Sequence, residues 1–298
     1  EEKSVRILKI MKRLYQKEII NRSDLKNEFN VDIKTIQRDI NTLKTYFLEE
    51  NHSEIKYTKI KKGYYLENSD ENNFTNEEIL AISKIILESR AFNKKEVKQL
   101  LKKLVNQSSV NDRKVVEEII RSEEFNYIPL QHGKNLLSII WNLSQHIAKK
   151  ELIYINYTTK NNENRKYNVK PLSIMFSEYY FYLMAYIENK EEYPAVLRID
   201  RISEIKNKNK KYSIPYKSTF KDGEFRKYVQ FMHSGKLTKI RFEYNGYIEY
   251  VLDRFPTAKV QEGENGTHIV EIEVYGSFGA EMWIRSQGEY VSSYEIIK

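Results

Sequence analysis

Apolar residues recur every three or four positions in three blocks at the start of the chain, which predicts three amphipathic helices. The first helix ends near Gln16, and its apolar stripe consists of Val5, Leu8, Met11, Leu14 and Tyr15. The second begins at the N-cap Ser23 and is apolar at Leu25 and Phe29. The third begins after Asp32, and its stripe consists of Ile33, Ile36, Ile40 and Leu43.

The opposite face of the third predicted helix is polar and cationic. Side chains of this kind suit DNA phosphates and base edges, and the free N–H groups at the helix start also favour an anion. A short helix, a tight turn and a polar-faced helix follow one another here, as a helix-turn-helix requires. We therefore expect DNA contacts from Lys34, Thr35, Gln37, Arg38 and Asn41.

Strand-like residues flank a turn directly after these helices. Residues 55–60 and 64–66 have the character of β-strands, and Lys61, Lys62 and Gly63 lie between them. Such a hairpin is the wing of a winged helix-turn-helix, and its lysines can reach the DNA backbone or the minor groove. The candidates are Lys56, Lys59, Lys61 and Lys62. Alternatively, these lysines only keep an exposed edge strand soluble.

A polar stretch, 67–73, separates these elements from a long helical region. Thr75 and Glu78 have the spacing of a capping box, in which each side chain bonds the backbone of the other residue. Apolar residues then continue at helical spacing as far as about residue 124, including Ile79, Ile82, Ile86, Val97, Leu100, Leu101, Leu104, Val115, Val116, Ile119 and Ile120. This helical connector either has its own core or supplies a dimer interface.

A further helix and a set of strands follow, and they predict a small β-barrel or a strongly curved sheet. Their ranges are 134–149 for the helix and 152–158, 167–174, 179–187 and 195–199 for the strands. Alternation places Phe181, Leu183 and Ala185 on the inner face of one strand, and Tyr180 and Tyr182 on its other face.

A hairpin that turns near Lys190 places Tyr182 directly opposite Arg198. An aromatic ring beside a guanidinium on an exposed surface suits a nucleotide or an oligonucleotide, because the ring stacks on a base and the cation binds phosphate. A tyrosine-rich solvent face with an arginine stacked on it explains the same pattern without any ligand. Spacing alone does not choose between the two.

Two segments of this region carry a family resemblance. Residues 179–185 (YYFYLMA) and 197–202 (LRIDRI) resemble the paired signatures of the WYL-domain transcription regulators. Tyr157 and the segment 169–171 (VKP) support it, and Phe181 stands where the family has its name-giving Trp. The resemblance extends over essentially the whole chain, because a winged N-terminal reader, a helical connector, a WYL domain and a C-terminal extension occur in this order in the family.

The resemblance implies an Sm-like β-barrel, effector sensing through a basic and aromatic surface, and homodimers that bind palindromic operators. In some relatives the effector is a nucleotide or a nucleic acid, and some control phage-defence genes. By position, the ligand-contact residues are Tyr157, Tyr182, Arg198 and Arg201. For Arg201 an alternative stays open, in which a structural pair between Asp200 and Arg201 braces the barrel.

The last part of the chain follows a Lys- and Asn-rich stretch, 206–211. Its predicted elements are a strand at 237–244, a helix at 247–252, strands at 258–260 and 267–275, a helix at 278–286 and a strand at 289–297. The order βαββαβ predicts a ferredoxin-like layer. This part also resembles the C-terminal extension (WCX) of WYL regulators, which implies a role in dimerisation.

Composition changes this picture mainly through charge. The 298 residues carry a net charge of +8, and residues 1–66 alone contain 15 Lys and Arg against 10 Asp and Glu, so the basic surplus is concentrated where DNA contacts are expected. The chain has no Cys, no apolar leader and no long apolar run, which favours a cytoplasmic protein that does not span a membrane.

No pattern of an enzyme is present. The histidines, His52, His132, His146, His233 and His268, are scattered without a metal-binding motif, and the glycine-containing segments lack the spacing of a phosphate or dinucleotide loop. There is no nucleophile elbow. We therefore expect no catalytic residue, no metal and no cofactor.

Together these patterns predict a multidomain α+β protein. Its predicted domains are a winged helix-turn-helix at 1–68, a helical connector at 69–128, a WYL ligand-sensing domain at 129–212 and a dimerising C-terminal domain at 213–298. The predicted function is a ligand-responsive, homodimeric repressor on a double-stranded operator. The alternative is a non-regulatory accessory protein that binds single-stranded nucleic acid, for which affinity should not depend on duplex sequence.

Overall fold

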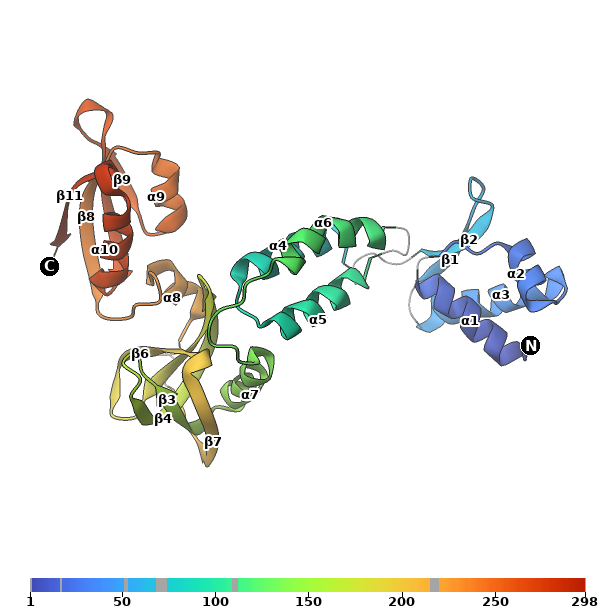
Figure 1. Cartoon of the computed structure of the whole chain (residues 1–298), viewed down its shortest axis with the longest axis horizontal. Helices are drawn as coiled ribbons and strands as arrows, with labels where there is room; N and C mark the ends of the chain where they lie inside the picture. Colours follow the sequence, from blue (N-terminus) through green and yellow to red (C-terminus); the bar gives the residue numbers. More distant parts are fainter. Residues whose placement is uncertain are drawn as a thin grey trace. The chain divides into compact units, whose positions relative to one another are not determined.

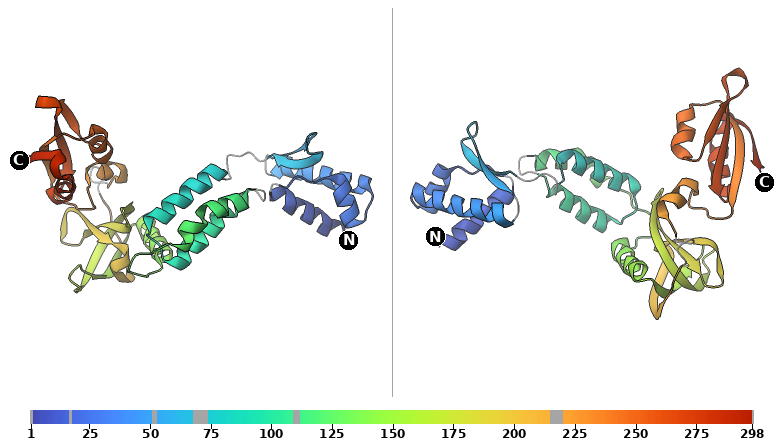
Figure 2. Two further views of the ribbon diagram at one scale, coloured as in Figure 1. Left: turned by 45° about the horizontal axis from the view of Figure 1, so that its top comes forward. Right: turned by 180° about the vertical axis from the view of Figure 1, so that it is seen from behind.

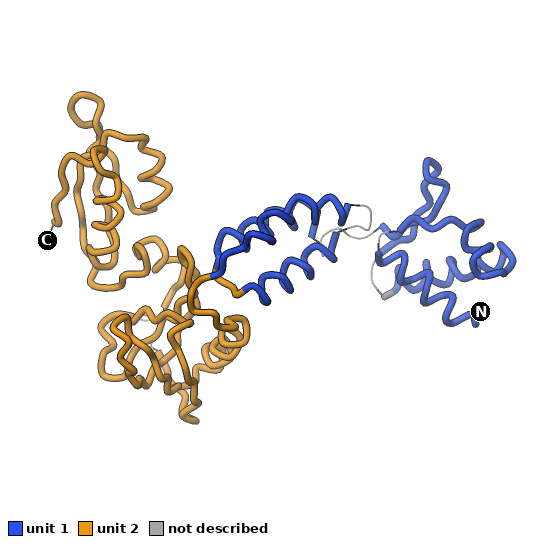
Figure 3. The backbone as a smooth tube through the Cα atoms, viewed as in Figure 1, with its two compact units in different colours: residues 1–90, 94–129 blue, residues 91–93, 130–298 orange. Residues whose placement is uncertain are grey.

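The computed structural model describes residues 2–16, 18–50, 53–67, 74–108, 112–214 and 220–297. They form two compact units, one of residues 1–90 and 94–129, the other of residues 91–93 and 130–298 (Figure 3). Helices and strands are labelled in Figure 1, and each unit is described by itself.

The N-terminal region, residues 2–67, consists of three helices and a hairpin. Its elements are α1 (Lys3–Tyr15), α2 (Arg22–Phe29), α3 (Ile33–Glu50), β1 (Glu54–Thr58) and β2 (Gly63–Glu67). The three predicted helices and the predicted hairpin are thus confirmed. Their shared core contains Ile10, Leu14, Leu25, Phe29, Ile36, Ile40, Leu43, Phe47, Ile55 and Leu66.

The buried face of α1 differs from the predicted apolar stripe. Arg6, Ile10 and Leu14 are buried, whereas Val5 and Leu8 are exposed. The reason is a buried ion pair, because Arg6 Nε lies 2.6 Å from Asp39 Oδ2 of α3. A charged residue therefore occupies a core position that a count of apolar residues cannot find.

The ends of α2 and α3 also differ from the prediction. The N-cap of α2 is Asn21, whose side chain accepts a hydrogen bond from the backbone N–H of Ser23, so Ser23 is already inside the helix. Ile33 is exposed because it opens α3, before the helix reaches the core. At the other end, Phe47 is buried and α3 continues past the predicted stripe to residue 50.

The helical region that follows contains α4 (Asn76–Ser89), α5 (Lys94–Val105) and α6 (Arg113–Phe125), which pack on one another. The predicted capping box is confirmed, because the Thr75 side chain accepts from the Glu78 backbone and the Glu78 side chain accepts from the Thr75 backbone. The buried residues of the predicted stripes are Ile79, Val97, Leu101, Val116 and Ile120.

The second unit begins with α7 (Leu136–Lys149), which lies along a five-stranded antiparallel sheet (Figure 2). The strands are β3 (Glu151–Thr158), β4 (Asn164–Ser177), β5 (Tyr180–Ile187), β6 (Lys190–Arg198) and β7 (Ile202–Lys211), in the order β6-β5-β4-β3-β7. Leu136 and Leu143 of α7 pack into the core with Ile153, Val169, Leu183, Ala185, Leu197 and Ile199. The strands predicted in this region are confirmed.

The Lys- and Asn-rich stretch 206–211 is part of strand β7, which the sequence pattern did not predict. As an edge strand, β7 leaves its lysines in solvent and shows little apolar alternation. Within the described ranges, β6 and β7 do not pair with each other, so a closed Sm-like barrel stays a prediction.

The C-terminal part adds α8 (Asp222–Tyr228), which the sequence pattern did not predict, and then a four-stranded sheet. Its elements are β8 (Leu237–Tyr244), α9 (Ile248–Arg254), β9 (Lys259–Glu262), β10 (His268–Tyr275), α10 (Ser277–Ser286) and β11 (Val291–Ile297). The predicted succession βαββαβ is confirmed, and the strand order is β11-β8-β10-β9. The core includes Phe242, Tyr244, Phe255 and Trp283.

Candidate functional site

The outer face of α3 carries the helix residues predicted to contact DNA. Lys34, Arg38 and Asn41 are exposed, whereas Thr35 and Gln37 are half-buried. The exposed residues are held on the surface because Ile36 and Ile40, between them, are fully buried. This arrangement presents two cations and an amide together on one helix, which is a donor set for phosphates and base edges.

The Gln37 side chain forms hydrogen bonds with other residues of the protein. Its Oε1 accepts hydrogen bonds from Arg22 Nη1 (2.7 Å) and from Tyr64 Oη (3.2 Å), and its Nε2 donates to Asn41 Oδ1 (2.9 Å). Gln37 therefore ties α3 to α2 and to the hairpin. It also orients the Asn41 amide, whose Oδ1 is already used.

The sequence analysis did not predict three neighbouring residues, Arg22, Lys44 and Tyr64. Two of them place a cation over the Tyr64 ring, with Arg22 Cζ at 5.8 Å and Lys44 Nζ at 5.3 Å from its centroid. Arg22 opens α2 and Lys44 extends the cationic face of α3 beyond Asn41. The signal for Lys44 is its step of three from Asn41 along the helix, which places both on neighbouring positions.

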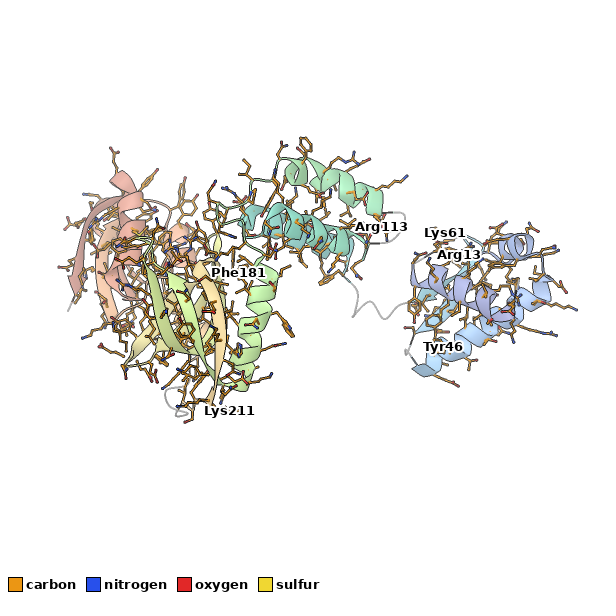
Figure 4. All side chains as sticks on the ribbon, turned by 60° about the horizontal axis from the view of Figure 1, so that its bottom comes forward. Arg13, Tyr46, Lys61, Arg113, Phe181 and Lys211 are labelled. Carbon is orange, nitrogen blue, oxygen red and sulfur yellow. The ribbon has the colours of Figure 1, made fainter. Side chains whose placement is uncertain are left out.

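The hairpin is confirmed with Thr58 opposite Gly63, so residues 59–62 form its loop. Lys59, Lys61 and Lys62 are exposed on this loop, and Lys61 is labelled in Figure 4. Lys56 differs, because it forms an ion pair with Glu67 on the neighbouring strand. Its hydrogen bond to Glu67 raises the pKa of Lys56. The structure thus leaves the loop lysines more available than Lys56.

The hairpin is anchored to the start of α2. Ile20 and Tyr64 exchange backbone hydrogen bonds of 2.8 and 2.7 Å, and Asn21 Nδ2 donates to the Lys62 carbonyl at 2.8 Å. Gly63 permits this contact, since a Cβ there would lie 2.5 Å from Ile19 Cγ2. The loop lysines and the α3 face therefore belong to one firmly connected surface, which we call the α3–hairpin surface (Lys34, Arg38, Asn41, Lys59, Lys61 and Lys62).

The predicted register of the β5–β6 hairpin is confirmed, with Tyr182 opposite Arg198. The Arg198 guanidinium, however, already has partners. Its Nε and Nη2 donate to the two carboxylate oxygens of Asp200 at 3.0 and 2.8 Å, and its Cζ lies 3.4 Å from the centroid of the Tyr180 ring. Burial opposes its charge, but the bonds to Asp200 raise the pKa of Arg198.

The predicted structural pair between Asp200 and Arg201 therefore needs correcting. Asp200 accepts two hydrogen bonds from Arg198, which lies two positions before it, and not from Arg201. The side chains of Arg198 and Asp200 are 22% and 6% exposed. At this degree of burial a paired guanidinium is costly to separate from its carboxylate.

Tyr157 lies at the same place, at the end of β3. Its Oη accepts a hydrogen bond from the Arg198 backbone N–H at 3.3 Å. Burial raises the pKa of Tyr157, and the nearby Arg201 partly opposes this rise. Tyr157, Tyr180, Arg198, Asp200 and Arg201 thus form one cluster, which we call the Arg198 cluster.

Tyr182 is not on an open surface, so the expectation of an exposed tyrosine face is wrong at this residue. It is half-buried and packs against a second core that contains Met175, Met184 and Phe225 of α8. This burial raises the pKa of Tyr182. The sequence pattern did not predict this packing, because α8 is a helix of only seven residues and leaves a weak periodic signal.

Within the described ranges, no three His, Asp or Glu side chains gather as ligands for a metal ion. Across the same ranges, every helix is too short or too polar to cross a bilayer.

Several solved structures are similar to this chain, among them the following two. For proteasome accessory factor B/C (PafBC) of Arthrobacter aurescens, identity is 12%, the TM-score is 0.30, and the match covers 98% of this chain and 44% of that one. For a CRISPR Cas-related protein, identity is 16%, the TM-score is 0.34, and the match covers 64% and 55%. This chain spans about half the length of both proteins, and neither likeness bears on its function.

No curated protein sequence matches this chain. The family comparison does find a match, for residues 139–207, and the family is the WYL domain. The matched residues run from α7 to β7 and include the β5–β6 hairpin and the Arg198 cluster. This chain therefore contains a WYL domain at residues 139–207.

Proposed function

We propose that the protein is a ligand-responsive transcription regulator that binds double-stranded DNA through a winged helix-turn-helix. The observation that supports this most is the α3–hairpin surface. Its exposed Lys34, Arg38 and Asn41 lie on a helix that Gln37 ties to the hairpin. A rigid polar-faced helix beside a lysine-bearing loop is the geometry that a major groove and its flanking backbone require.

In this proposal the residues have different roles. Arg38 and Asn41 contact base edges, with the Asn41 amide oriented by its bond from Gln37. Lys34, Thr35 and the loop lysines contact phosphates, which gives affinity without sequence information. Lys56, held by Glu67, contributes less than the loop lysines. Gln37 acts by positioning its neighbours.

The regulatory part of the proposal rests on the WYL domain. A homodimer in the cytoplasm binds a palindromic operator whose half-sites lie one helical turn apart, about 34–36 Å. An effector bound by the WYL-containing unit, a nucleotide or an oligonucleotide, shifts the dimer away from the DNA-binding state, and repression is relieved. Such a shift requires that the effector bind the two states with different affinities.

The alternative of a single-strand-binding accessory protein finds less support. It requires Tyr182 and Arg198 to offer an open ring and a free cation. Tyr182 is instead half-buried against the core that contains Phe225, and Arg198 is bonded to Asp200 and stacked on Tyr180. We therefore favour duplex DNA at the α3–hairpin surface.

The test is selection of bound duplex fragments from the source genome by the full chain. We expect the enriched fragments to share two inverted half-sites. Fragments without a common sequence, together with a higher affinity for single strands of the same length, would support the accessory-protein alternative and contradict the proposal.

A further inference from the structure

A pocket of about 630 Å³ lies in the second unit, away from the Arg198 cluster. It is bounded by the start of β6, by α8 with the two residues before it, and by the segment 234–237. Its volume is in the range of pockets that hold small molecules. None of the four ligand residues predicted from the family resemblance lines it, because Arg198 lies at the opposite end of β6.

The walls of this pocket are aromatic. Tyr186 of β5, Tyr193 of β6, Phe225 of α8 and Tyr275 of β10 all line it. The Phe225 and Tyr275 rings are stacked, with centroids 5.2 Å apart and an angle of 22° between their planes. Aromatic rings gathered in one lining suit a planar ring system, which can stack on them.

Charged residues also line this pocket, and their side chains are exposed. Lys221 and Lys236 supply positive charge, and Glu192 and Glu224 supply carboxylates. Lys236 and Glu192 are 3.6 Å apart with side chains 81% and 69% exposed, so this ion pair contributes little and can exchange for a ligand. The pocket can thus bind an anion and accept hydrogen bonds from the same ligand.

The rim of the pocket is preformed. Gly235 lies against Gly276, such that a Cβ on Gly235 would be 3.1 Å from the Gly276 Cα. The Gly276 N–H donates to the Lys236 carbonyl at 2.8 Å. Next to them, Ser234 lines the pocket, and its buried Oγ has no hydrogen-bond partner within the described ranges. A ligand that enters therefore meets fixed backbone and an unsatisfied hydroxyl.

We propose that this pocket binds a planar aromatic compound that carries one anionic group, chemistry that a nucleoside monophosphate combines. The ring stacks on the aromatic lining that includes Tyr193, and the anion binds Lys221 and Lys236. The inference builds on the ligand sensing proposed above and gives it a site other than the Arg198 cluster.

Phe225 connects this pocket to the motif residues. Its ring lines the pocket and also belongs to the core against which Tyr182 packs. A ligand that displaces Phe225 therefore loosens the packing of Tyr182, which is a physical route from binding to the WYL sheet.

The experiment is titration calorimetry of the full chain with adenosine 5′-monophosphate, adenosine and ribose 5-phosphate. We expect saturable binding of the monophosphate and weaker binding of the two fragments, because each lacks one half of the required chemistry. Tyr193→Ala should weaken monophosphate binding about ten-fold through lost stacking. Lys221→Ala should weaken it without affecting adenosine.

Matched controls separate this site from the rest of the molecule. Tyr247→Ala and Lys208→Ala remove an exposed ring and an exposed cation elsewhere in the same unit and should leave binding unchanged. Arg198→Ala should also leave it unchanged. Absence of monophosphate binding, or loss of binding in Arg198→Ala with retention in Tyr193→Ala, overturns the proposal. Because no DNA is present, these outcomes are independent of whether the chain binds an operator.

Discussion

The α3–hairpin surface and the Arg198 cluster were both predicted as ligand-contact sites, yet they differ in what their cations already bind. On the first, Lys34, Arg38 and the loop lysines are exposed. In the second, Arg198 is bonded to Asp200 and stacked on a tyrosine. An exposed cation can therefore bind an anion directly, whereas a paired cation first has to lose its partner.

The largest effect is expected at the buried pair beneath the α3–hairpin surface. Asp39→Ala leaves Arg6 buried without its carboxylate and should destabilise the N-terminal region by about 3–5 kcal/mol. Hydrogen exchange of the amides in α1 to α3 measures this loss. Both tryptophans, Trp141 and Trp283, lie in the other unit, so the unfolding transition seen by their fluorescence should not move.

A control replaces both partners with apolar residues. Arg6→Met with Asp39→Leu removes the charges together and should recover most of the lost protection, because no unpaired ion is left buried. Equal losses in the single and double variants would show that the pair is not what stabilises the helix packing.

The next prediction concerns Arg198, whose guanidinium is bonded to Asp200. Asp200→Asn removes the charge that holds Arg198 and should destabilise the WYL sheet by about 1–3 kcal/mol. Urea unfolding with hydrogen exchange in β3 to β7 provides the measurement. Glu204→Gln, which breaks an exposed ion pair with Lys206 in the same sheet, is the matched control and should cost under about 1 kcal/mol. If the two variants are equally stable, Arg198 is a free cation and the comparison fails.

A smaller effect separates two lysines of the hairpin. Lys61→Ala should lower the slope of log affinity against log salt by about 0.9 for one lost phosphate contact. Lys56→Ala should change this slope less, because Lys56 is paired with Glu67. Affinity for one duplex between low and moderate salt gives both slopes. Equal slopes for the two variants would mean that the Glu67 pair does not withhold Lys56 from DNA.

The smallest effect is a pH dependence at Tyr182. Burial raises its pKa, so the folded protein keeps the phenol proton to a higher pH than the unfolded chain does. The stability that this supplies is complete below the unfolded pKa of about 10 and is lost as pH rises through the folded value. Tyrosinate absorbance of the wild type minus that of Tyr182→Phe reports the titration. If Tyr182 ionises at the ordinary tyrosine pKa, the core against which it packs does not shield its hydroxyl from water.

Much of the fold follows from periodic patterns in the sequence. The three N-terminal helices, the hairpin, the capping box at Thr75 and the βαββαβ succession were predicted because each has an apolar repeat or a turn signal. The register of Tyr182 with Arg198 was predicted from alternation and one turn position. What failed were elements without such a repeat: the edge strand β7 and the short helix α8.

The candidate sites were predicted less completely, for a related reason. Periodicity shows which side chains share a face, and so it found Lys34, Arg38 and Asn41. It does not show what else touches that face. The bonds of Gln37 to Arg22 and Tyr64, and the pair of Arg198 with Asp200, depend on side-chain geometry between elements or around a turn. The pocket lined by Tyr193 and Phe225 joins segments far apart in the sequence and has no local signal.

If the exposed cations of α3 bind duplex DNA, the affinity for a selected genomic duplex depends on them. Lys34→Ala combined with Arg38→Ala should weaken binding about hundred-fold or more, since two charge-assisted contacts are lost. The charge-matched control Lys98→Ala with Lys102→Ala, on exposed positions of α5, should retain wild-type affinity. Unchanged affinity in the α3 variant, or an equal loss in the control, would contradict the account.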